Sequence, residues 1–445
     1  MADTSSATRR LLARCVIAGM LAVLAAACTT PPDPLPRLDV PAHRPADPVR
    51  PCVRDNTPPP DPAPEPGDAE VRFDRASNTI TVARGEDVTI PTLGDEVPAS
   101  ALRDLGNGEW LLEANITVLT DASLRISAPD VRWLKMASGD GAFVAITALG
   151  GGITVEGVCI TSWDEANGRV DENHTDRRSY VLARDGATMT IRDSEIRYLG
   201  SGDVEAYGLA WRTEGTTGSI TDSVVSNLYF GLYSHEVDGL QVIDNEFHDN
   251  VLYGVDPHTG SRNMTIEGNR VHHNGKHGII LAEDCVDSVV RDNVVYANEH
   301  HGIVMYLRSD NNVIEGNETF DNAAQGININ ESNGNTIRGN KVYDNAESGI
   351  TITQTGRDNV VADNEVRGNG KDGVRLVSES VGTAVRGNTI GRNERYGIYI
   401  DTEGAFDISK NTIFGNRIGI TARGHELEEG DNEVFDNGQG AVLTR

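Results

Sequence analysis

The chain has 445 residues, of which 38% are hydrophobic and 24% charged, so it is long enough for one large folded domain or two ordinary ones. With 39 Lys and Arg against 67 Asp and Glu, the formal net charge of -28 argues against a nucleic-acid partner and against adhesion to anionic membranes. Only 5% of the residues are aromatic and 47 are glycine, a composition that favours short strands and tight turns over packed helices.

The first 27 residues have the pattern of an export signal. Three arginines between positions 9 and 14 precede an apolar run over 15–27 that ends in three alanines before Cys28. The run is too short to span a membrane comfortably. We therefore expect 1–27 to be a signal peptide and Cys28 to be a lipidation site, with plain cleavage as the alternative. Either outcome predicts an exported protein, which is a cell-envelope lipoprotein or is periplasmic or secreted, and which meets a membrane only through the lipid.

Residues 28–67 form a proline-rich segment, because 14 of the 18 prolines lie between Pro31 and Pro66. Such a density imposes extended backbone with no apolar periodicity to bury, so this segment is expected to be a tether. Of the cysteines beyond it, Cys159 and Cys285 are expected to be buried apolar residues first and disulfide partners second; the pairing of Cys52 stays open.

Residues 68–445 are expected to form one domain. Short alternations of aliphatic and polar residues, which predict strands, begin at about Glu70. Only Ser100–Leu105 looks briefly helical.

An internal repeat provides the strongest signal for the fold. It consists of Asn, four residues, Asn, and then Gly followed by an aliphatic residue, and its first Asn advances by 24 or 23 residues from Asn245 to Asn388. A repeat this short without a helix predicts one coil of a right-handed parallel β-helix per unit, an all-β solenoid. The recurring Asn side chains are expected to bond backbone and to stack as ladders.

The residues after each Gly alternate between core and surface. Positions one and three after it are mostly aliphatic, as in Ile279 and Leu281, so positions two and four and the residue before the Gly are expected to face outward. Read down the coils, this outward face gathers ionisable groups. Residues 253–308 hold five Lys and Arg against seven Asp and Glu, a balance of -2, and six of the 11 histidines lie between His258 and His301.

This outward face predicts proton-transfer chemistry on an anionic polysaccharide. Tyr253, Asp256 and His258 place a phenol, a carboxylate and an imidazole on one strand. Coils about 4.8 Å apart can carry one sugar unit each. The side chains expected to bind substrate are Tyr233, His235, Lys276, His277, His301, Arg308 and Asn328. A metal site built from the histidines is the competing interpretation. Acidic loops such as Glu283-Asp284 could hold Ca²⁺, but no calcium-loop spacing indicates it, and no cofactor is expected.

At these residues the chain resembles the mannuronan C5-epimerases, in particular the periplasmic bacterial type. The signature reads Tyr253-Gly254-Val255-Asp256-Pro257-His258-Thr259. Further matches are Lys276-His277-Gly278-Ile279-Ile280, Gly302-Ile303-Val304 after His301, Glu331, and Ile160-Thr161-Ser162-Trp163-Asp164-Glu165. The similarity runs from about Leu102 to Gly424.

The resemblance implies a reaction in which β-D-mannuronate becomes α-L-guluronate within the polymer. His258 is implied as the base that removes H5, Tyr253, or water beside it, as the group that handles the proton on the opposite face, and Asp256 as the group that tunes or orients His258. His277 and His301 are implied to help bind the sugar. The protein is expected to act as a monomer.

Two positions depart from the family pattern. Thr259 stands where the family carries an acidic residue, and Glu283 aligns with a family Arg that neutralises the substrate carboxylate. Lys276 and Arg308 are the candidate replacements for this Arg. Two other functions stay open: a polysaccharide lyase, which shares the first proton abstraction but cuts the chain, and a glycan-binding protein without turnover.

Overall fold

The computed structural model describes residues 37–52, 68–424 and 430–444. The predicted signal peptide and Cys28 lie outside these residues. Residues 39–445 form one compact unit, to which the following description refers. Within the described ranges, no helix is long and apolar enough to cross a membrane.

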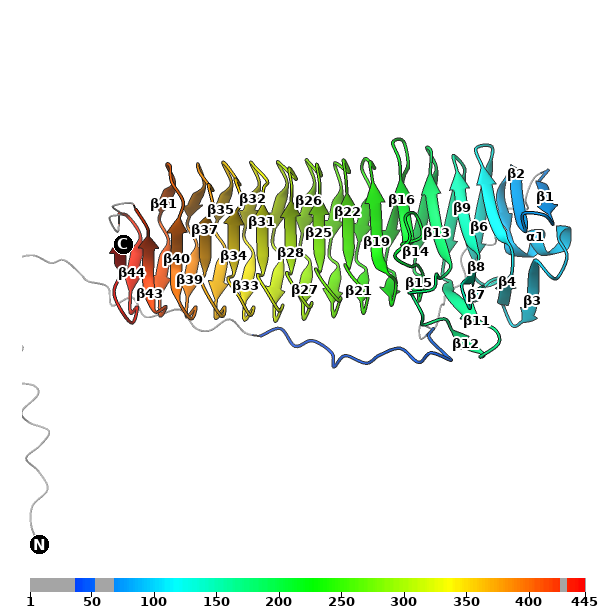
Figure 1. Ribbon diagram of the computed structural model, residues 1–445, viewed down its shortest axis with the longest axis horizontal. Coiled ribbons are helices and arrows are strands. Elements are labelled where there is room, and N and C mark those ends of the chain that lie inside the picture. Colours follow the sequence, from blue (N-terminus) through cyan, green and yellow to red (C-terminus); the bar gives the residue numbers. More distant parts are fainter. Residues whose placement is uncertain (1–36, 53–67, 425–429, 445) are drawn as a thin grey trace, which may run out of the picture. The chain divides into compact units, whose positions relative to one another are not determined.

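The unit is a right-handed parallel β-helix in which successive coils stack strand upon strand (Figure 1). This confirms the predicted fold. Each regular coil contributes one strand to each of three sheets, and β2 pairs within both the first and the second sheet. Antiparallel pairs β1/β2, β3/β4, β7/β8 and β11/β12 occur only toward the N-terminal end of the described coils.

The first sheet contains β1 (Glu70–Asp74), β2 (Thr79–Thr89), β5 (Asn115–Leu119), β9 (Ala145–Leu149), β13 (Tyr180–Arg184), β16 (Gly208–Arg212), β19 (Phe230–His235), β22 (Val255–His258), β25 (Ile279–Ala282), β28 (Ile303–Tyr306), β31 (Ile327–Asn330), β34 (Ile350–Thr353), β37 (Val374–Val377), β40 (Tyr396–Asp401), β43 (Ile418–Ala422) and β45 (Val442–Thr444). The second sheet contains, besides β2, the strands β6 (Ala122–Ser127), β10 (Gly152–Glu156), β14 (Thr188–Arg192), β17 (Thr217–Thr221), β20 (Gln241–Ile243), β23 (Thr265–Glu267), β26 (Val289–Arg291), β29 (Val313–Glu315), β32 (Thr336–Arg338), β35 (Val360–Ala362), β38 (Ala384–Arg386) and β41 (Asp407–Ser409).

The third sheet contains β3 (Leu102–Gly106), β4 (Glu109–Leu112), β7 (Trp133–Gly139), β11 (Cys159–Asp164), β12 (Arg169–Val170), β15 (Glu195–Arg197), β18 (Val224–Ser226), β21 (Glu246–His248), β24 (Arg270–His272), β27 (Val294–Tyr296), β30 (Glu318–Phe320), β33 (Lys341–Tyr343), β36 (Glu365–Arg367), β39 (Thr389–Gly391), β42 (Thr412–Phe414) and β44 (Glu433–Phe435), and β8 (Ala142–Phe143) pairs with β7.

The asparagines form two buried ladders, as the repeat predicted. Asn269, between the second and third sheets, donates from Nδ2 to Oδ1 of Asn293 (2.9 Å) and to the Val242 carbonyl (2.8 Å), and its backbone N–H also donates to Asn293. The second ladder, between the third and first sheets, repeats this pattern from Asn274 to Asn298. The ladders satisfy turn groups that burial removes from water, which fixes the register of each coil on the next.

The core is a set of aliphatic columns. Ile279, Ile303, Ile327 and Ile350 are neighbours in register on the first sheet, and each has 0% of its surface exposed. Full burial of such a side chain contributes about 1.5–3 kcal/mol. The alternate side chains of the same strands point outward and are available to contact a ligand.

The helix expected at Ser100–Leu105 is wrong. Residues from Leu102 onward pair with β4, and the described helix is α1 (Ile90–Glu96) instead. Its N-cap Thr89 accepts a hydrogen bond at Oγ1 from the Thr92 N–H (3.2 Å), and a proline stands in its first turn. Capping and proline placement decided this helix rather than composition.

Residues 39–52 of the proline-rich segment contact the coils. Cys52 forms a disulfide with Cys159 in β11, and the Pro48 carbonyl accepts the Val170 N–H (2.9 Å). The prediction that Cys159 is an unpaired apolar residue is therefore wrong, whereas Cys285 is free and fully buried as expected. We call residues 39–52 the strap.

Candidate active site

The register of the first sheet brings the predicted residues together. Tyr233 of β19 lies beside Asp256 of β22, and His235 lies beside His258. On the next coils His258 is followed by Ala282, and Val304 by Asn328. The outward-facing side chains of β16 to β31, together with Tyr253, Lys276, His277 and His301, make up what we call the candidate face.

Asp256 has an unusual environment for an outward-facing carboxylate. Only 1% of its surface is exposed, and neither carboxylate oxygen has a hydrogen-bond partner. The aromatic cluster that contains Phe230 and Tyr233 packs beside it on the preceding coil. Burial raises the pKa of Asp256 well above its usual value; nearby Glu283 raises this pKa further, and Lys276 lowers it. A carboxyl group held neutral in this way can donate a hydrogen bond, which a carboxylate cannot.

His258 is half-buried and hydrogen-bonded to its neighbour. Its Nδ1 lies 2.7 Å from Oγ1 of Thr259, and this Oγ1 donates to Oε2 of Glu283 (3.3 Å). Burial lowers the pKa of His258, and the Glu283 charge raises it in part. Neither carboxylate oxygen of Asp256 is hydrogen-bonded to His258. Thr259 and Glu283, the two departures from the family pattern, supply the contact instead.

His277 and His301 form a stack of neutral imidazoles. Nδ1 of His277 accepts the His301 N–H (3.3 Å), and Nδ1 of His301 accepts the Gln325 N–H (3.2 Å). Burial, with further contributions from neighbouring histidines and Lys276, lowers their pKa values to about 2 and about 3. Each ring therefore keeps its proton on Nε2 and can donate it to a ligand.

Tyr253 links this stack to a cation. Its ring stacks on His277 (5.2 Å between centroids, 1° between planes), and its hydroxyl accepts a hydrogen bond from Nζ of Lys276 (2.8 Å). Lys276 is exposed, and its positive charge lowers the pKa of Asp256. Its ammonium group therefore lies close enough to influence the strand that carries Asp256 and His258.

Arg212 is a cation that the sequence interpretation missed. It ends β16 and lies beside His235, which in turn lies beside His258. Its Nη1 is buried without a hydrogen-bond partner, and its guanidinium lies 5.1 Å from the Tyr233 ring centroid. Extending the outward column one coil toward the N-terminus, where the Asn repeat is absent, would have found it.

The remaining predicted binding residues differ in their availability. Arg308 is engaged, because its Nε and Nη2 each donate to Asp284 at 2.7 Å. His235 lies with Nδ1 3.6 Å from Oε2 of Glu236. Asn328 is buried at 7% exposure, and its Oδ1 has no partner.

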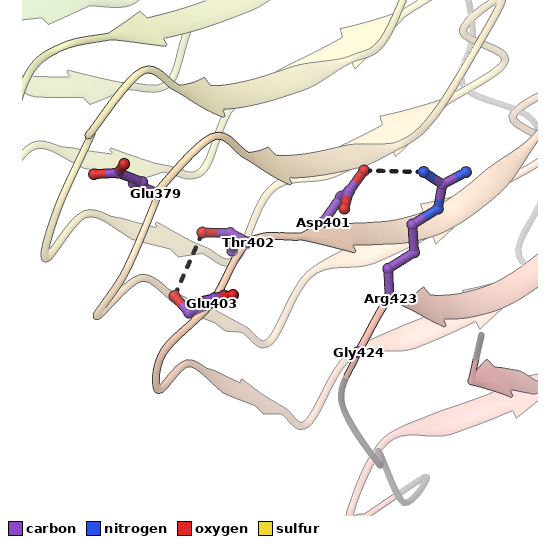
Figure 2. Close-up of a pocket in the computed structure, with 6 residues that line it drawn as sticks. All are labelled: Glu379, Asp401, Thr402, Glu403, Arg423 and Gly424. Carbon is purple, nitrogen blue, oxygen red and sulfur yellow. Dashed lines mark hydrogen bonds and ion pairs between the residues drawn. The ribbon is translucent and has the colours of Figure 1, made fainter.

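A pocket of about 910 Å³ lies on later coils, away from these residues. Figure 2 shows its lining, in which Asp401 faces Arg423 at 3.3 Å and Thr402 lies beside Glu403. Its carboxylates come without an imidazole or a free cation among the lining residues, so it has no counterpart of the His258 chemistry.

Comparisons with known proteins agree with the resemblance. A family described as periplasmic copper-binding protein (NosD) matches residues 145–364, and one described as right handed beta helix region matches 304–437. The mannuronan C5-epimerase of Pseudomonas aeruginosa is 29% identical over 215 residues, which are 45% of this chain and 39% of that protein. The mannuronan C5-epimerase AlgG of Azotobacter vinelandii is 28% identical, over 45% of this chain and 40% of its own length.

Among solved structures, the periplasmic alginate epimerase AlgG superposes with a TM-score of 0.63 at 22% identity and covers 82% of each chain, which shows a shared fold. The sequence matches span about two fifths of the curated relatives. The chain is thus similar in sequence to mannuronan C5-epimerases over 45% of its length, which agrees with the resemblance at the Tyr-Gly-Val-Asp-Pro-His motif.

Proposed function

We propose that the protein is an exported polyuronate C5-epimerase that converts β-D-mannuronate to α-L-guluronate within an alginate-like chain. The observation that carries this proposal is the buried, unpartnered Asp256 carboxyl beside a half-buried imidazole on a face that also holds Arg212 and Lys276. A C6 carboxylate is the substrate group that such a set of donors fits, because a neutral carboxyl and two cations all stabilise an anion.

In the proposed reaction, Nε2 of His258 removes H5, and the electron pair of the C5–H bond delocalises into the C6 carboxylate. Neutral Asp256 donates a hydrogen bond to that carboxylate, and Arg212 and Lys276 compensate its growing charge. Tyr253 then returns a proton to C5 from the opposite side, directly or through water. Side chains of this chain, with or without a bridging water, move the protons, so the scheme uses no cofactor.

Nε2 of His258 must be free of a proton for this role. The base is proposed to act in the tautomer whose Nδ1–H donates to Oγ1 of Thr259 at 2.7 Å while this Oγ1 donates to Glu283, which leaves Nε2 free. Nδ1 also accepts the Thr259 N–H at 3.0 Å, a contact that favours the proton on Nε2, so this proton must move to Nδ1 before His258 removes H5. Glu283 thus acts through Thr259, and the family Arg is replaced by Arg212 and Lys276.

Neutral His277 and His301 are proposed to bind the neighbouring sugar units. Their rings stack on consecutive coils with 5.0 Å between centroids. This is close to the strand spacing of about 4.8 Å at which each coil can carry one sugar unit.

Product analysis tests this function. Poly-mannuronate is incubated with the protein and followed by proton NMR. Arg338→Ala is the control, because Arg338 is exposed on the second sheet and its Nε donates to Oε2 of Glu315 (2.7 Å). Guluronate signals at constant chain length support the epimerase. Unsaturated chain ends would show a lyase, and tight binding without product would show a glycan-binding protein.

A further inference from the structure

Four imidazoles and one carboxylate meet on the third sheet, whereas the candidate face lies on the first. His248 of β21 and His272 of β24 are neighbours in register, and their rings stack at 5.2 Å with 9° between planes. Asp249 and His273 follow them at equivalent turn positions, each with a positive φ (55° and 54°). His43 comes from the strap. We call these five residues the strap cluster.

The polar atoms of the strap cluster lie close together. His43 Nε2 is 2.9 Å from Oδ1 of Asp249, and His248 Nδ1 is 2.8 Å from Oδ2 of the same carboxylate. Nδ1 of His272 and Nδ1 of His273 lie 2.8 Å apart. The cluster contains two triads that share His43, and within each triad one donor atom per residue lies within 4.8 Å of the others.

A stack of rings along the sheet explains only part of this cluster. His248 and His272 begin a column that continues through Tyr296, Phe320 and Tyr343 at spacings of 4.7, 5.1 and 5.0 Å. His43 and His273 lie outside that column. Their own rings stack at 4.0 Å with 12° between planes, so His43 of the strap packs against His273. His273 occupies a turn position that Ala297 occupies on the next coil.

Glu246 provides an independent sign of metal ligation. Its Oε1 lies 3.1 Å from Nε2 of His272 and accepts that ring's proton, so the lone pair of Nδ1 points into the cluster. Histidines that bind metals usually donate their other N–H to a carboxylate in this manner, which fixes the tautomer and the direction of the ring.

We propose that the strap cluster binds a divalent transition metal ion of the Zn²⁺ class and that this ion fastens the strap to the coils that carry β21 and β24. Imidazole nitrogens with one carboxylate oxygen are the donors that such ions prefer over Ca²⁺ or Mg²⁺, and Zn²⁺ takes about four of them. The metal at His43 then adds to the disulfide at Cys52 and to the hydrogen bond between Pro48 and Val170. The proposal is independent of the reaction on the candidate face.

The test uses the full exported chain with its disulfide intact, stripped with a chelator and titrated with Zn²⁺ by calorimetry. One ion per chain is expected. His43→Ala is expected to weaken binding by at least about tenfold, a loss typical even of changes around the ligands. Hydrogen exchange supplies a second readout, because Zn²⁺ is expected to slow exchange of the strap amides in the wild type and not in His43→Ala.

His301→Ala is the matched control, since His277, His300 and His301 form another group whose donor atoms lie within 4.8 Å of one another. It is expected to bind Zn²⁺ as the wild type does. Absence of binding in the wild type, or equal affinity in His43→Ala, would overturn the proposal. So would loss of binding in His301→Ala alone, which would place the ion on the candidate face. Because His43 lies outside the coils, His43→Ala leaves their core intact.

Discussion

Oγ1 of Thr259 lies 2.7 Å from Nδ1 of His258 and donates to Glu283 on the following coil. In sequence, both Thr259 and Glu283 depart from the epimerase pattern, and each taken alone weakens the resemblance. Together they form a hydrogen-bonded chain that ends on the proposed base. In the structure, the two departures from the pattern therefore form one hydrogen-bonded unit.

Glu283→Gln and Thr259→Val are expected to lower kcat with little change in KM, because they leave the substrate contacts in place. We expect a loss of about 10- to 100-fold, part of the roughly 10²- to 10⁴-fold that general base catalysis contributes. The Glu283 charge raises the pKa of His258, so Glu283→Gln lowers that pKa and moves the acid limb of the kcat/KM profile to lower pH. A profile that keeps the wild-type limb would contradict this role; Glu315→Gln on the second sheet is the control.

Asp256→Leu, which removes the buried carboxyl and leaves no hydrogen-bond donor, is expected to stabilise the protein at neutral pH and to abolish most of its activity. The folded-state pKa of Asp256 lies above its unfolded value of 3.8, so the folded protein loses stability as pH rises from 3.8 toward the folded pKa. An unpartnered buried polar group costs about 1–3 kcal/mol, and loss of one donor to a developing anion costs about 10²- to 10³-fold in kcat. Denaturation midpoints and kcat measured at pH 7.5 test both halves. A variant that is less stable and fully active would show that Asp256 is only structural.

Arg212→Ala is expected to lower kcat/KM by about 10-fold or more, since a hydrogen bond to a charged group contributes about 1.5–3 kcal/mol. Arg212→Lys should recover part of this loss, because it keeps the charge but not the fork of donors. Unchanged kinetics with a lower melting temperature would mean that Arg212 only packs against Tyr233. Arg338→Ala serves again as the exposed control.

The double variant His277→Gln/His301→Gln is expected to lose less unfolding free energy than the wild type as pH falls below 6.5. Gln is chosen because Gln325 already occupies the equivalent position on the next coil. In the folded protein these pKa values are about 2 and about 3, below the ordinary 6.5, so the unfolded chain takes up the protons first as pH falls below 6.5. Each histidine then lowers the free energy of unfolding by up to about 1.4 kcal/mol per pH unit. Denaturant midpoints between pH 7 and pH 4 measure this. Equal slopes in the wild type and the double variant would contradict neutral, buried imidazoles.

The repeat made the fold predictable because each coil of a parallel β-helix contacts only the coils directly before and after it. Each Asn needs only its counterpart one coil away, so a spacing of 24 or 23 residues determines the register that brings Asp256 beside Tyr233. The aliphatic positions after each Gly then identify the side chains that face the core. The residues that alternate with them are predicted to face outward and form the candidate face.

Other features were hidden because their contacts are not periodic. The Cys52–Cys159 disulfide and His43 join the strap to coils more than 100 residues away, and no spacing in the sequence encodes such a pairing. Arg212 lies on a coil without the Asn signature. The burial of Asp256 depends on aromatic side chains of neighbouring coils, which alternation alone counts as exposed.

The central claim is that His258 removes the C5 proton of a uronate and that a different group returns one from the opposite side. Proton NMR of poly-mannuronate treated in D₂O with wild-type protein and with His258→Ala tests it most directly. The account predicts guluronate that carries deuterium at C5 with the wild type and no exchange at C5 with the variant. Guluronate formed without deuterium by the wild type, or exchange at the wild-type rate in His258→Ala, would contradict it.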